Sequence, residues 1–141
     1  MIVRINTALR NAILDGIFNA AAGIATLDGG TAQFRTGANP ASADNAASGT
    51  LLATATISAD AVSAAAGGSI SKNAAAWQDL SVDITGVCGW ARFISADGLK
   101  WIDFDVTDNV GNGAIKMSNT TLTAGDLLLI TSFALTMPGT T

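Results

Sequence analysis

Apolar residues recur at spacings of three and four near the start of the chain, in "RINTALRNAILDGIFNAAAG". This period is typical of an amphipathic α-helix whose apolar stripe is Ile5, Leu9, Ile13 and Ile17. Asn6 or Thr7 can cap the start of the helix, and Gly23 can end it. Polar residues such as Asn11 and Asp15 fall on the opposite side. The stripe predicts a helix that packs either on the chain's own sheet or on a neighbouring subunit.

From about residue 31 the apolar period changes to two, which is typical of β-strands. A first strand is predicted in "AQFRT". The others are predicted from apolar residues that share one face: Leu51, Ala53, Ala55 and Ile57, then Leu80, Val82 and Ile84, and finally Leu127, Leu129, Phe133, Leu135 and Met137. A shorter strand is predicted in "GAIKMS". The Ala-, Ser- and Gly-rich segment 58–77 is predicted to be mostly loop.

The run "GWARFISADGLKWIDFDV" predicts a β-hairpin, because Asp97-Gly98 is a two-residue turn signal between two strands. With that turn, Phe93 faces Ile102 and Ala91 faces Phe104 on an apolar face. On the other face the predicted pairs are Arg92 with Asp103, Ile94 with Trp101, and Trp90 with Asp105. We expect the ion pair to be exposed and therefore weak.

Short strands separated by turn signals favour a mainly β fold, namely an antiparallel β-sandwich of jelly-roll or immunoglobulin-like type. About seven to eight strands are expected, preceded by the N-terminal helix. The length fits a single domain over residues 1–141, with the helix or arm in 1–23 and the sandwich in 31–138.

A long polar loop interrupts this pattern between two strands. Residues 37–49 carry no large apolar side chain and consist of Gly, Ala, Asn, Pro, Ser and Asp. Such a loop contributes hydrogen bonds and shape rather than a core. A solvated loop with no partner is one interpretation, and the family resemblance given below implies the other, a loop that reaches across a neighbouring subunit.

The composition argues against an enzyme. The chain has no His, no Glu, no Tyr and one Cys, so general acid–base work and nucleophile activation have few candidate groups. We expect no catalytic residue, no cofactor and no metal. The one acidic cluster consists of Asp103, Asp105, Asp108, Asn109 and Asn112. It offers oxygen ligands for Ca²⁺, but its spacing does not fit an EF-hand loop, and a solvent-facing strand and turn is the preferred interpretation.

The charge pattern argues against nucleic acid and membrane as partners. The net charge is −4, and the seven Lys and Arg residues are scattered rather than clustered. The longest strongly apolar run, residues 127–130, is far too short to span a membrane.

Cys88 is expected to be a buried free thiol, with cross-linking between subunits as the alternative. Trp77, Trp90 and Trp101 favour a core or an interface over a sugar-binding platform.

Four motifs in order resemble a family of small structural proteins of tailed-bacteriophage virions. They are "ALRNAILDGI", "AQFRTGANPASADNAASGTLLATATI", "WARFISADGLKWIDFDV" and "TLTAGDLLLITSFALTMP". The family patterns are "ALRNA.LDAI", "TG..P..AD.A..GTLLAT", "WFR.....G..V.DGDV" and "G....ITSFT.T.P". The chain departs from the third pattern, with Trp90-Ala91-Arg92-Phe93 in place of "WFR" and Asp103-Phe104-Asp105-Val106 in place of "DGDV".

The resemblance implies a non-enzymatic virion protein, made in the host cytoplasm and assembled into the phage particle. A capsid decoration or cement protein is the first expectation, a neck, collar or tail component the alternative, and a host-glycan adhesin a second alternative. Expected partners are other copies of the chain and the major capsid protein or other virion proteins. The expected interface residues are Ile5, Leu9, Ile13, Ile17, Asn39, Pro40, Asp44, Asn45, Trp90 and Trp101.

Overall fold

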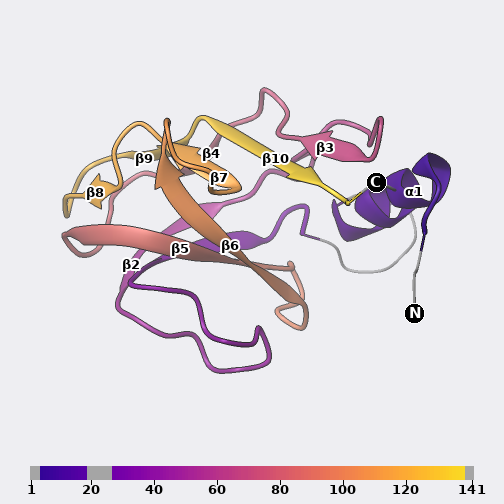
Figure 1. Cartoon of the computed structure of the whole chain (residues 1–141). Coiled ribbons are helices and arrows are strands. Elements are labelled where there is room, and N and C mark those ends of the chain that lie inside the picture. Colours follow the sequence, from indigo (N-terminus) through magenta and orange to yellow (C-terminus); the bar gives the residue numbers. More distant parts are fainter. Residues whose placement is uncertain (1–3, 19–26, 139–141) are drawn as a thin grey trace.

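The computed structural model describes residues 4–18 and 27–138 as one short helix and a curled β-sheet (Figure 1). The helix is α1 (Thr7–Phe18). The strands are β1 (Thr31–Thr36), β2 (Leu51–Thr56), β3 (Ser69–Ser71), β4 (Trp77–Asp79), β5 (Gly86–Ile94), β6 (Trp101–Asp108), β7 (Ile115–Met117), β8 (Thr121–Leu122), β9 (Leu128–Ile130) and β10 (Ser132–Thr136). The predicted mainly β fold with an N-terminal helix is confirmed. No helix in the described residues is long and apolar enough to cross a membrane.

The strands form one mixed sheet rather than two packed antiparallel sheets. Their order is β3-β10-β7-β6-β5-β1-β2-β4-β9, and β8 pairs with the start of β5. The strands number ten, and β6 and β7 run parallel. The predicted antiparallel sandwich of about seven to eight strands is therefore not confirmed. Three strands that the sequence pattern missed, β3, β4 and β8, have three, three and two residues, too few to show a period.

The segment 128–136 explains why the sheet curls. Its first half, β9, pairs with β4, and its second half, β10, pairs with β7 near the opposite end of the strand order. The prediction that one face of this segment holds Leu127, Leu129 and Phe133 together is wrong. The alternation of buried and exposed side chains is interrupted at Thr131 and Ser132, which are both exposed. The buried residues are therefore Leu128, Ile130 and Phe133.

The strand predicted over Leu80, Val82 and Ile84 is also wrong. Strand β4 ends at Asp79, and of the three only Val82 is buried. The backbone here makes single hydrogen bonds to the 126 region and to β2 but forms no strand ladder. The N–H of Val82 donates to the Asp126 carbonyl, and the N–H groups of Asp83 and Ile84 both donate to the Leu52 carbonyl.

The β5–β6 hairpin has the predicted register throughout. Phe93 pairs with Ile102 and Ala91 with Phe104 on the inner face, while Arg92 pairs with Asp103 on the outer face. The turn is reinforced by Asp97, whose carboxylate accepts hydrogen bonds from the Ser95 hydroxyl, the Lys100 ammonium and the Leu99 N–H. These bonds lower the pKa of Asp97 to about 2, the Ser95 bond contributing most.

Helix α1 turns a different face to the protein than its apolar stripe predicts. Leu14 and Phe18 are fully buried, whereas Leu9 and Ile13 are exposed and Ile17 is partly buried. The residues expected on the solvent side decide the orientation, because Asp15 accepts from the Ala65 N–H and Asn11 from the Gly68 N–H, both at 2.8 Å. The predicted cap is confirmed at Asn6, which accepts from the Leu9 N–H. The predicted end at Gly23 lies outside the described residues.

An aromatic cluster fills the core where the helix meets the sheet. The ring of Phe133 lies 5.5 Å from Phe18, 5.4 Å from Trp77, 5.6 Å from Phe93 and 5.2 Å from Phe104, measured between centroids. Tilted and edge-on pairs at these distances add to the stabilisation from burial alone. Phe133 therefore joins α1, β4, β5 and β6.

Phe133→Ala is expected to lower the free energy of unfolding by about 3–5 kcal/mol, since it leaves a cavity among four aromatic rings. Urea denaturation measures the change. Leu129→Ala on the adjacent strand β9 is the control: its half-exposed side chain is expected to cost less than about 1 kcal/mol. Equal losses in the two variants would contradict the central place given to Phe133.

Candidate interaction surface

The outer face of the β5–β6 hairpin holds a buried ion pair. The guanidinium of Arg92 donates from Nε to Asp103 Oδ1 at 2.7 Å and from Nη2 to Asp103 Oδ2 at 2.8 Å. Both side chains are almost entirely covered, with 7% and 6% of their surface exposed. The hydrogen bonds that Arg92 donates to Asp103 raise the pKa of Arg92. The expectation of an exposed, weak pair is therefore wrong, although the pairing itself is confirmed.

Two tryptophans enclose the guanidinium from either side. The central carbon of the Arg92 guanidinium lies 5.5 Å from the ring centroid of Trp90 and 5.5 Å from that of Trp101. Both distances are within the range of cation–π attraction. Trp90 is fully buried, and Trp101 keeps 42% of its surface exposed.

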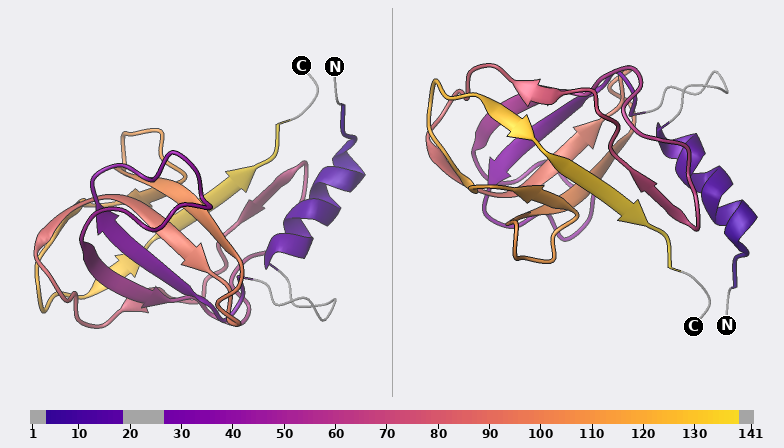
Figure 2. Two further views of the ribbon diagram at one scale, coloured as in Figure 1. Left: turned by 90° about the horizontal axis from the view of Figure 1, so that it is seen from below. Right: turned by 90° about the horizontal axis from the view of Figure 1, so that it is seen from above.

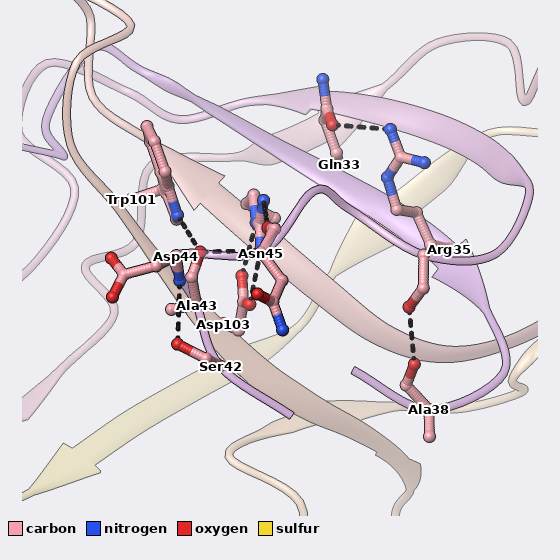
Figure 3. A network of polar contacts seen from close by, with 11 residues as sticks. Gln33, Arg35, Ala38, Ser42, Ala43, Asp44, Asn45, Trp101 and Asp103 are labelled. Carbon is pink, nitrogen blue, oxygen red and sulfur yellow. Dashed lines mark hydrogen bonds and ion pairs between the residues drawn. The ribbon is translucent and has the colours of Figure 1, made fainter. Parts of the chain in front are cut away.

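The long loop 37–49 covers this arrangement (Figure 3). Arg92 donates to the carbonyls of Asn45 and Ala43, each at 3.2 Å, and the indole N–H of Trp101 donates to the same Ala43 carbonyl at 2.6 Å. One arginine thus bonds a carboxylate on the sheet and two carbonyls on the loop. Strand β5 is consequently buried on both faces, by the core on one side and by the loop on the other.

The neck of the loop is fixed by close backbone contacts. Thr36 and Thr50 are joined by two hydrogen bonds, and Gly37 and Gly49 adopt left-handed φ values of 79° and 71°. A side chain at Gly89 would meet the Gly37 carbonyl, since an ideal Cβ there lies only 2.0 Å from that oxygen. These contacts seat the start of the loop directly on β5.

The structure divides the predicted interface residues into three groups. Asn39, Asp44 and Asn45 are exposed on the loop, and Pro40 is half-exposed beside them. Trp101 is next to this loop surface, while Trp90 lies beneath it and is fully buried in the folded chain, which fits the core alternative for this residue. Leu9, Ile13 and Ile17 lie on α1 and Ile5 just before it, and Figure 1 shows α1 away from the loop.

The acidic cluster of β6 and its following turn does not converge. Asp103 is engaged by Arg92, Asp105 is exposed, and the Asp108 carboxylate accepts from the N–H groups of Val110 and Gly111. In the described part of the chain no three Asp, Glu, Cys or His side chains are grouped as metal ligands would be.

Cys88 is buried and unpaired as predicted, and burial raises the pKa of its thiol to about 11.

The sequence predicts the Arg92–Asp103 pair but not the loop 37–49 that buries it. The available signal was the sequence Trp90-Ala91-Arg92, which places an aromatic residue and a cation on the same strand face beside the Trp101 opposite Ile94. A cation between two indoles is better shielded than an isolated surface arginine. Backbone carbonyls of the loop carry no such signal, because any residue supplies them.

Comparisons of the chain with protein-family models, with curated proteins and with solved structures find no match. The function is therefore inferred from the chain's own residues.

Asp103→Ala is expected to lower the free energy of unfolding by about 3–5 kcal/mol, because it leaves the buried Arg92 without its counter-charge. Chemical denaturation measures the loss. Asp105→Ala, two residues along the same strand on the same side, is the control and is expected to change stability by no more than about 0.5 kcal/mol. If the two variants were equally stable, the ion pair would not support the fold.

Proposed function

We propose that the protein is a non-enzymatic structural component of a phage virion, and in particular a capsid decoration or cement protein bound in many copies at joints between capsid subunits. The observation that carries this proposal is the anchored loop 37–49. The bonds that Arg92 donates to the loop carbonyls hold the loop in one conformation. In that conformation the loop presents Asn39, Pro40, Asp44 and Asn45 outward.

The anchoring supports a docking role on energetic grounds. Association is weakened when loops and side chains must be ordered on binding, at roughly 0.5–1.5 kcal/mol per mobile side chain. The bonds from Arg92 and Trp101 hold the loop backbone before any partner arrives. A loop that served only to join β1 and β2 would not require thirteen residues and a buried arginine.

The family-like motifs coincide with the parts that build this surface. The second motif spans β1, the loop and β2, and the third motif spans β5 and β6 with Arg92, Trp101 and Asp103. The two departures from the third motif also fit together. The family pattern has Phe and Gly where this chain has Ala91 and Phe104, and these two residues are cross-strand partners on the buried inner face. One large aromatic side chain is kept in the pair, so the departures preserve the hairpin core.

A neck, collar or tail component of the virion is the alternative, since it would use the same kind of surface. The glycan-adhesin alternative is less well supported. Trp77 and Trp90 are fully buried, and the indole N–H of the exposed Trp101 is already bonded to Ala43.

The copy number of the chain in purified virions tests the proposal. Quantitative mass spectrometry of particles from the phage that encodes the chain is expected to give hundreds of copies, in proportion to the major capsid protein. A few tens of copies or fewer would assign it to the neck or tail instead. Complete absence from purified particles would refute the virion role.

Asn39→Arg is expected to weaken attachment to particles that lack the protein by at least about tenfold, because it places a bulky cation on the docking surface. Its melting temperature should not change, since the loop is held through backbone carbonyls. Asn109→Arg, an equally exposed change in the β6–β7 connection, is the matched control and should bind like the natural protein. Unchanged attachment of the Asn39 variant would exclude the loop as the docking surface.

A further inference from the structure

Two exposed apolar patches remain outside the surface described above. The helix patch consists of Leu9 and Ile13 on α1, which are 53% and 36% exposed. The strand patch consists of Leu80, Leu127 and Leu129, which are 74%, 56% and 44% exposed. The pairing of Asp79 with Leu128, and the bond from the Val82 N–H to the Asp126 carbonyl, bring Leu80 alongside Leu127.

The strand patch borders a hollow. A depression of about 190 Å³ is lined by Leu127 and Leu129 together with Thr121, Asp126 and Met117 among others. The hollow is open to solvent and its exposed rim is mostly polar, with Ser118, Asn119 and Asp126 beside the two leucines.

The two patches lie at opposite ends of the molecule. In Figures 1 and 2 helix α1 forms one extremity, and the loops around β8 and β9 form the other, in all three views. The helix patch of one chain thus cannot cover the strand patch of the same chain, but a second copy placed end to end brings the two together.

The charges around the patches are of opposite sign. Arg4 and Arg10 lie near the helix patch, and the one acidic residue of α1, Asp15, accepts from the Ala65 N–H on the side facing the rest of the protein. The positive end of the helix dipole adds to the two arginines. The segments 77–88 and 118–131, which form the strand patch and its hollow, carry Asp79, Asp83 and Asp126 and no Lys or Arg. Asp83 and Asp126 are both exposed. Such complementarity steers association and fixes its orientation.

We propose that the helix patch of one copy docks on the strand patch of a second copy, in a head-to-tail contact. Leu9 and Ile13 cover Leu127, Leu129 and the hollow beside them, and Arg4 approaches Asp126. Because the two surfaces differ, the contact is heterologous, and repetition closes a ring or extends a filament. It identifies the surfaces for the self-assembly expected of a virion protein, but it does not depend on the virion role and is tested on the purified chain.

The experiment uses two single variants, Leu9→Asp and Leu127→Asp, each of which destroys one patch and leaves the other intact. Sedimentation velocity over a wide concentration range is expected to show self-association of the natural chain, and at least about tenfold weaker association of either variant alone. Their mixture should form a heterodimer and nothing larger, because one intact helix patch meets one intact strand patch. Val110→Asp, which alters a 90% exposed side chain outside both patches, is the matched control and should associate like the natural chain.

Circular dichroism should show an unchanged melting temperature for each variant, since all three side chains are exposed. A charge exchange gives a second readout. Arg4→Asp and Asp126→Arg should each weaken association, and a mixture of the two variants should recover it.

Three outcomes would overturn the proposal. They are a natural chain that stays monomeric throughout, a mixture that remains monomeric, and an effect of Leu9→Asp without any effect of Leu127→Asp. The last would indicate a symmetric contact between two helices. A self-association that follows the expected pattern in a chain absent from virions would uphold this contact and refute only the virion role.

Discussion

The arrangement of the outer surface depends on one buried guanidinium. Arg92 is bonded to Asp103 and lies between the rings of Trp90 and Trp101, and its remaining donors reach two carbonyls of the loop 37–49. A charge removed from water in this way is tolerated only when its donors are satisfied. The ion pair, the stacked rings and the loop therefore support one another, and the loop is part of the fold although it adds no apolar core residue.

The same interaction shows what the sequence could and could not predict. The Asp97-Gly98 signal predicts the correct hairpin register, although the turn itself spans 95–98, where the Gly98 N–H donates to the Ser95 carbonyl and Gly98 alone has a left-handed φ. The burial of Arg92 depended on a loop more than forty residues earlier in the chain, whose contacts are made by backbone atoms. The composition of the loop predicts a candidate surface but not its attachment to the sheet, and that attachment buries Trp90.

The errors in the fold have a common physical origin. Helix α1 was assigned its apolar stripe from periodicity, but the polar bonds of Asn11 and Asp15 to the backbone of residues 65–68 turn Leu14 and Phe18 inward instead. The last strand was predicted as one alternating segment, but its two halves pair with different neighbours and the alternation slips between them. In both cases contacts with distant parts of the chain, rather than local periodicity, decide which side chains are buried. Leu9, Leu127 and Leu129 are exposed as a result.

The glycines at the neck of the loop limit where the loop 37–49 can change in sequence. An ideal Cβ at Gly49 or Gly89 would lie 2.0 Å from a backbone oxygen, and Gly37 adopts a left-handed φ of 79° that side chains disfavour. Between that neck and the carbonyls over Arg92, residues 39–41 form no hydrogen bond to the sheet that the structure records. The number and type of residues at 39–41 can therefore change while the neck of the loop and its bonds to Arg92 stay in place. A peptide inserted at 39–41 therefore separates docking from folding, because it alters the proposed docking surface at Asn39 and Pro40 while the neck and the bonds to Arg92 stay in place.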